Sequence, residues 1–158
     1  MKTLETLFEA MIQKFGRDDF ERAATADHVA GLLIAHDDTA AALVSRDRAF
    51  IEETIADCAI QVTAVMLCER AEFIDLDDES QWDRSKQMIA HEIWCAEASH
   101  RFAEIARTIY YEFGPNALAE SAQLALIHLS ALCQHIGLED LGTIAHRRVN
   151  QLEIGTDD

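Results

Sequence analysis

Apolar residues recur at spacings of three and four along most of this chain, which is the period of an amphipathic helix. The first segment is typical, because Leu4, Leu7, Phe8 and Met11 share one face and Gly16 ends the pattern. The same period predicts six helices, over Thr3–Phe15, Thr25–Val44, Asp47–Glu72, Gln81–Phe113, Pro115–Ile136 and Leu138–Leu152. Thr25 or Asp27 is the expected cap of the second, and a bend is expected near Met88–His91 in the fourth.

These helices predict an all-α fold. The chain holds one proline and six glycines in 158 residues, so it has little turn material for a sheet of short strands. We expect a helical bundle of five to six helices in a single domain, with the second to fifth helices as its core. Within residues 1–158, an N-terminal half (1–72) is followed by an acidic surface loop (73–80) and a C-terminal half (81–158).

The two halves have similar helical content, which raises the alternative of a tandem pair of degenerate two-helix units. An offset of 66 residues superimposes the third predicted helix on the fifth. It places Thr54 and Asp57 opposite Glu120 and Gln123, each followed by a long apolar run. Identity across the overlay is very low, so the repeat stays an alternative to a single non-repetitive bundle.

The formal net charge of −16 narrows the classes of partner. A negative surface repels nucleic-acid phosphates and anionic lipid, and it disfavours a triphosphate unless a divalent metal accompanies it. We therefore expect neither direct nucleic-acid binding nor membrane binding. The acidity has two interpretations, either solubility alone or a surface that mimics DNA to occupy a basic protein partner. Apolar faces left over in so small a bundle favour a homo-oligomer.

The four cysteines, Cys58, Cys68, Cys95 and Cys133, all fall in apolar helical patterns without a CxxC pair. They are expected to be buried thiols in a reducing compartment. The N-terminus has no secretory signal pattern, and no uncharged apolar stretch reaches membrane-spanning length. These features predict a cytoplasmic protein.

Candidate chemistry lies on the fourth and fifth predicted helices. Glu97 and His100 are three residues apart, as are Glu120 and Gln123, so each pair projects from one helical face. The Gly-Pro turn at 114–115 makes these helices antiparallel neighbours, so the four groups are expected to converge. Glu104, one turn beyond His100, is expected to join them.

These residues resemble the MazG-like, all-α NTP pyrophosphatases. Ala117–Gly137, ALAESAQLALIHLSALCQHIG, is similar to the helix that carries the family's ExxD motif. Residues 97–104, EASHRFAE, resemble the helix with the ExxE motif, and residues 138–150 resemble the helix that follows. The resemblance covers about residues 88–152.

The resemblance implies hydrolysis of a nucleoside triphosphate between its α and β phosphates, releasing a monophosphate and pyrophosphate. It implies Glu97 and Glu120 as catalytic metal ligands, completed by His100 and Gln123. The metal would be Mg²⁺, with Mn²⁺ as an alternative, because the imidazole of His100 stands where the family has glutamate. Gln123 likewise stands where the family has aspartate.

Two lost carboxylates leave a second hypothesis open, a catalytically inactive relative that acts as an acidic binding or regulatory protein. Carboxylates of the first half offer partial substitutes, and Asp57 is the one we include as a metal ligand. The others are Asp37, Asp38 and Glu53. Trp82 and Trp94 lie near the expected site, where we favour helix packing over stacking on a nucleobase.

Overall fold

The computed structural model describes residues 4–73 and 91–152, and all regular structure in these two ranges is helical. The predicted all-α class is therefore confirmed. The α-helices are α1 (Leu4–Phe15), α2 (Thr25–Ser45), α3 (Arg48–Cys68), α5 (His91–Tyr110), α6 (Pro115–Ile136) and α7 (Leu141–Gln151). Two short 3₁₀ turns, η1 (Arg17–Asp19) and η2 (Arg22–Ala24), connect α1 to α2.

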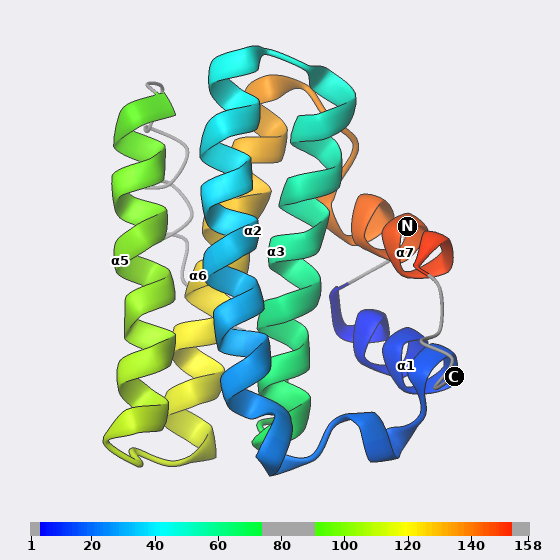
Figure 1. Cartoon of the computed structure of the whole chain (residues 1–158), viewed down its shortest axis with the longest axis vertical. Coiled ribbons are helices and arrows are strands. Elements are labelled where there is room, and N and C mark those ends of the chain that lie inside the picture. Colours follow the sequence, from blue (N-terminus) through cyan, green and yellow to red (C-terminus); the bar gives the residue numbers. More distant parts are fainter. Residues whose placement is uncertain (1–3, 74–90, 153–158) are drawn as a thin grey trace.

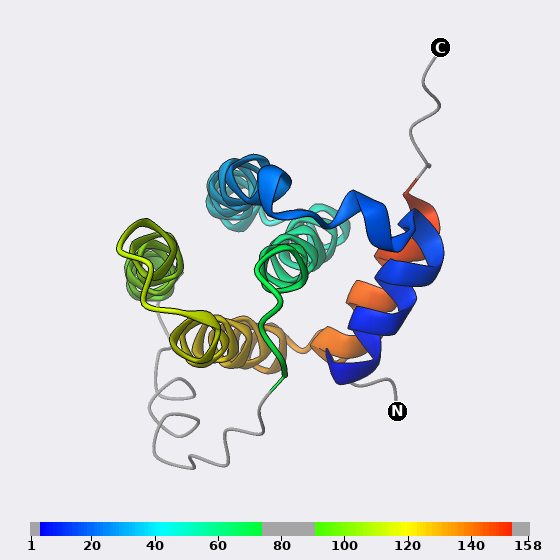
Figure 2. The ribbon, with the colours of Figure 1, turned by 90° about the horizontal axis from the view of Figure 1, so that it is seen from below.

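Helices α2, α3, α5 and α6 form a four-helix bundle (Figures 1 and 2). Seen from its end in Figure 2, α2 and α3 form one side and α5 and α6 the other, with α3 beside α6 and α2 beside α5. Each helix runs antiparallel to both of its neighbours, as the colours of Figure 1 show. The second to fifth predicted helices thus make up the bundle, as the hydrophobic period indicated.

Helices α1 and α7 form a second layer against one side of the bundle. They contact each other, and both contact α3, so α3 is covered on three sides (Figure 2). This position explains why the centre of α3 is apolar nearly all round. Its residues from Val62 to Cys68 are all buried.

The two helical hairpins of the bundle share part of their burial pattern at an offset of 66 residues, the offset at which the third and fifth predicted helices superimpose. At this offset four buried positions of α2 coincide with buried positions of α5: Leu32 with Ala98, His36 with Phe102, Thr39 with Ile105, and Ala42 with Thr108. The bundle thus consists of two facing hairpins that bury several of the same positions.

Most helix ends follow local sequence signals. The Asp47 side chain caps α3 by accepting a hydrogen bond from the Phe50 amide at 3.2 Å. Pro115 begins α6, and Gly137 ends it in the left-handed conformation, with φ 81°. These three boundaries are confirmed.

Several boundaries differ from the prediction, and α5 ends at Tyr110 rather than Phe113. Ala24 occupies the N-cap position of α2 without a side-chain cap, because the Thr25 hydroxyl instead donates to Glu69 at 2.9 Å. Helix α3 ends at Cys68, because the left-handed Arg70 turns the chain so that the Ala71 amide bonds to the Met66 carbonyl. Helix α7 begins at Leu141, where Asp140 caps it. The loop at 74–80 and the expected bend near Met88 lie outside the described residues.

The core is contiguous and includes three of the four cysteines. Cys58, Cys68 and Cys133 are buried, whereas Cys95 is partly exposed, and none forms a disulfide. Burial raises the pKa of the Cys58 and Cys133 thiols to about 12, so these two groups stay protonated at neutral pH. None of the helices in residues 4–73 and 91–152 combines the length and the apolar content that crossing a bilayer requires.

Candidate functional site

The antiparallel hairpin of α5 and α6 positions the candidate site. Near its turn the hydroxyls of Thr108 and Ser121 lie 3.4 Å apart. Toward its open end, the Trp94 indole donates to the His128 carbonyl at 3.1 Å, and the His128 ring bonds to the Trp94 carbonyl at 3.0 Å. These cross-helix contacts determine which residues of α5 lie opposite which residues of α6.

This register brings three predicted site residues to one surface groove of about 390 Å³. His100 and Glu104 line it from α5, and Glu120 lines it from α6. His100 and Glu120 are exposed, whereas Glu104 is half-buried and lies 2.8 Å from Arg107, one turn further along α5. Glu104, which the sequence suggested only as an addition to the motif, thus shares the groove with Glu120.

Glu97 does not line this groove. Its carboxylate lies 3.1 Å from the guanidinium of Arg101, four residues along α5, and both side chains are mostly buried. Arg101 lines the groove, whereas Glu97 does not. This pair is less exposed than the Glu104–Arg107 pair, since the Glu97 side chain is 21% exposed and the Glu104 side chain 34%, so Glu97 is less able than Glu104 to exchange its arginine for a metal ion.

Gln123 is also outside the groove. Its side chain is 4% exposed and belongs to the bundle interior. A neutral amide tolerates such burial better than the aspartate of the resembling motif would, because an unpaired buried carboxylate is strongly disfavoured. The burial of Gln123 is therefore consistent with a packing role.

Asp57 lies in an ion-pair network between α3 and α7. Its carboxylate accepts two hydrogen bonds from Arg148, at 2.8 and 3.4 Å, and Glu53 lies 2.9 Å from the same guanidinium. Arg147 in turn contacts Glu52 and Glu139. The structure thus places Asp57 with α7 and does not bring it to the α5–α6 groove.

The N-terminal hairpin holds the counterparts of the groove residues. At the 66-residue offset, Asp38 corresponds to Glu104, Thr54 to Glu120 and Asp57 to Gln123. Asp38 is exposed, but Thr54 is buried and uncharged, and Asp57 is paired with Arg148. Of the two related positions in the bundle, only the C-terminal one has carboxylates from both of its helices along one groove.

The described part of the chain contains no group of three His, Cys, Asp or Glu side chains arranged to hold a metal ion. The four ligands expected from Glu97, His100, Glu120 and Gln123 are therefore not assembled as a preformed site. The carboxylates of Glu104 and Glu120 and the imidazole of His100 lie along one groove and could supply only some of the ligands of a metal ion. Magnesium is commonly bound in this way, by one or two carboxylates together with water and phosphate oxygens.

Two buried histidines form a polar cluster inside the bundle, next to the groove. His36 of α2 bonds through Nε2 to the Ser99 hydroxyl at 2.8 Å, and His128 stacks on Trp94 with ring centroids 5.1 Å apart. Neither imidazole Nδ1 has a hydrogen-bond partner among the described residues. Burial lowers the pKa of both histidines, so both are neutral at pH 7.

One residue of this cluster was anticipated. Trp94 was expected to serve helix packing, and its burial confirms this expectation. Trp82 lies outside the described residues. Arg101 was missed, although its four-residue spacing from Glu97 is the ordinary signal for an ion pair along a helix.

No protein-family model, no curated protein and no solved structure matches this chain.

Proposed function

We propose that the groove between α5 and α6 binds a nucleoside triphosphate with its divalent metal and hydrolyses it to a monophosphate and pyrophosphate. The observation that supports this proposal is the placement of Glu104 and Glu120 on facing helices along one groove, together with His100. This donor set overlaps the residues of the MazG-like resemblance, with Glu104 taking the position expected of Glu97.

The charge of the chain favours a metal that arrives with the nucleotide. At a net charge of −16 the protein repels a free triphosphate, and a bound Mg²⁺ or Mn²⁺ reduces that repulsion. Glu104 and Glu120 would complete a metal shell whose other ligands are phosphate oxygens and water. The metal is then part of the substrate, which agrees with the lack of a three-ligand group in the described residues.

The remaining groove residues have complementary roles in this proposal. The Arg101 guanidinium carries several N–H donors, so it can hold Glu97 and contact a phosphate oxygen with another donor. Glu120 is exposed in the first turns of α6 and can orient the attacking water. The exposed imidazole of His100 can accept or donate the proton that the reaction moves.

Pyrophosphate release from a panel of standard and modified deoxynucleoside triphosphates, with Mg²⁺ or Mn²⁺, tests the proposal. Activity that Glu120→Ala abolishes would support it. Glu112→Ala is the matched control, because Glu112 is also exposed but does not line the groove. The proposal would be contradicted if the wild-type protein released no pyrophosphate and also showed no nucleotide-dependent thermal shift.

A second candidate function is an inactive relative that uses its acidic surface to bind a basic protein. The neutralisation of Glu97 by Arg101 and the burial of Gln123 favour it, because both remove motif positions from the groove. This candidate predicts no turnover and salt-sensitive binding of cationic polypeptides. Metal-dependent turnover that requires Glu120 would exclude the inactive form.

A further inference from the structure

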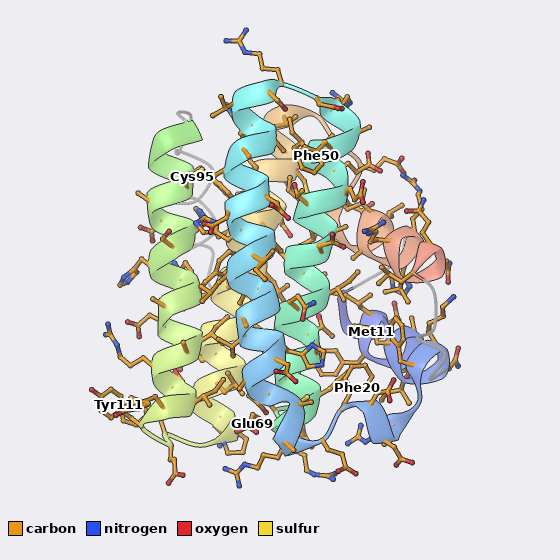
Figure 3. All side chains as sticks on the ribbon, viewed as in Figure 1. Met11, Phe20, Phe50, Glu69, Cys95 and Tyr111 are labelled. Carbon is orange, nitrogen blue, oxygen red and sulfur yellow. The ribbon has the colours of Figure 1, made fainter. Side chains whose placement is uncertain are left out.

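An apolar cavity lies at the end of the bundle where α2 ends and α3 begins. Its volume is about 890 Å³, within the range of small-molecule sites. Leu43 and Val44 of α2, Ile51 of α3 and Ile136 of α6 contribute its apolar wall. Figure 3 shows Cys95, which also lines it, near the N-terminal end of α5. Side chains of all four bundle helices therefore meet here.

Among the described residues, the ionisable side chains that line this cavity, apart from Cys95, are basic, although the chain as a whole is acidic. The protein has 29 acidic and 13 basic residues, counting Lys and Arg. Among the described residues, the cavity lining includes Arg46, Arg48 and His135 but no carboxylate. The cavity thus combines an apolar wall with a cationic rim on an acidic protein.

Helix termini account for only part of this basic rim. Arg48 donates to the Gly137 carbonyl at 2.6 Å and so satisfies the C-terminal end of α6. Arg46 ends α2 in the left-handed conformation, with φ 60°, and its guanidinium makes no hydrogen bond or ion pair with the described residues. Arg46 is therefore available to a ligand, and Arg48 retains further N–H donors.

We propose that this cavity binds a single-chain amphipathic carboxylate, with its alkyl chain against the apolar wall and its carboxylate at Arg46 and Arg48. An alkyl chain gains free energy from leaving water along the wall. A carboxylate matches the planar guanidinium in geometry and charge. A nucleotide fits less well, because its several phosphate charges would face a mostly apolar surface. The site is distinct from the α5–α6 groove and shares no lining residue with it.

Labelling of the Cys95 thiol reports occupancy directly. Cys95 is the one partly exposed cysteine, because Cys58, Cys68 and Cys133 are buried. Dodecanoate, below its micelle-forming concentration, is expected to slow maleimide labelling of Cys95. Dodecanol and dodecyltrimethylammonium at the same concentration are expected to protect it weakly. Equal protection by all three ligands, or protection by none, would overturn the proposal.

Charge variants test the role of the rim. Arg46→Glu is expected to raise the dissociation constant of dodecanoate, measured by calorimetry, about fivefold, as the loss of one exposed ion pair implies. Arg17→Glu makes the same charge change at an exposed position of η1 and is expected to leave binding unchanged. Equal effects of the two substitutions would contradict a specific carboxylate site. Sedimentation velocity tests whether a second copy of the chain occupies the cavity instead. A dimer in which Cys95 resists labelling without ligand would overturn the carboxylate site and assign the cavity to the dimer interface.

Discussion

Trp94 and His128 each hydrogen-bond to the other's main-chain carbonyl across the α5–α6 interface. The two distances are 3.1 Å for the indole N–H and 3.0 Å for the imidazole Nε2, and the rings are stacked with an interplanar angle of 5°. The bond to a carbonyl assigns the proton of the neutral imidazole to Nε2. The pair aligns α5 with α6 within two turns of the residues that line the groove.

Trp94→Phe is expected to destabilise the bundle by about 1 kcal/mol or more, because it removes the indole donor and part of a fully buried ring. Urea unfolding followed by circular dichroism measures the change. Tyr110→Phe is the control, since Tyr110 is 79% exposed, and it is expected to change stability little. Equal effects of the two substitutions would show that the Trp94–His128 contact does not stabilise the hairpin.

Acid is expected to destabilise the fold through His36 and His128. Burial lowers the pKa of both groups below the ordinary value of 6.5, although Asp37 opposes the shift at His36 and the Trp94 carbonyl and Glu97 oppose it at His128. Arg101 and the mutual repulsion of the two imidazoles act with burial at His128. The unfolded chain therefore binds protons that the folded chain does not. The contribution of the two neutral histidines to the free energy of unfolding is fully present above about pH 6.5. It decreases as the pH falls through that value toward the lowered pKa values.

Unfolding free energies between about pH 7.5 and about pH 5.5 measure this effect. His128→Gln is expected to flatten the dependence, whereas His100→Gln, which replaces an exposed imidazole, is expected to preserve it. An unchanged slope in His128→Gln would show that burial of this ring does not cause the acid sensitivity.

Asp57→Asn is expected to lower stability by about 1 kcal/mol, because it weakens a charge-assisted pair that is only partly exposed. Its effect on nucleotide turnover is expected to be small, since Asp57 contacts Arg148 of α7 and not the groove. Asp38→Asn alters an exposed carboxylate on α2 and is the control for stability. A large loss of turnover in a folded Asp57→Asn protein would show that Asp57 contributes to the nucleotide site and would contradict this prediction.

Glu97→Gln and Glu120→Gln are expected to differ in their effect on turnover. Glu120 lines the groove, so its loss is expected to lower kcat about a hundredfold, the scale of a positioned general base. Glu97 acts only through Arg101, so Glu97→Gln is expected to change kcat by a few fold at most. Steady-state pyrophosphate release measures both, and a larger loss in Glu97→Gln would contradict the assignment.

The fold could be predicted because its signals are local. The period of apolar residues gave the helices, and Asp47, Pro115 and Gly137 gave three of their ends. The end of α3 was set four residues too late, because a non-glycine residue, Arg70, adopts the left-handed turn with φ 56°. Nothing in residue type signals that turn.

The site was predicted less well because it depends on register and on distant pairs. Motif spacing placed the candidate residues on two helices that do pack against each other, but only their packing reveals that Glu104, rather than Glu97, shares the groove with Glu120. The partner of Asp57 is 91 positions away in sequence, at Arg148, so periodicity gives no indication of it. The Glu97–Arg101 ion pair could have been predicted, because opposite charges four residues apart on a helix commonly pair.

The most direct test of the α5–α6 groove as a nucleotide site is paramagnetic broadening of backbone amide signals by Mn²⁺ bound to a non-hydrolysable nucleoside triphosphate. The structure predicts selective broadening around His100, Glu104, Glu120 and Ser121, which Glu120→Gln weakens. Broadening centred on Asp38 and Asp57 of the other hairpin, or no selective broadening on either hairpin, would contradict the proposed site.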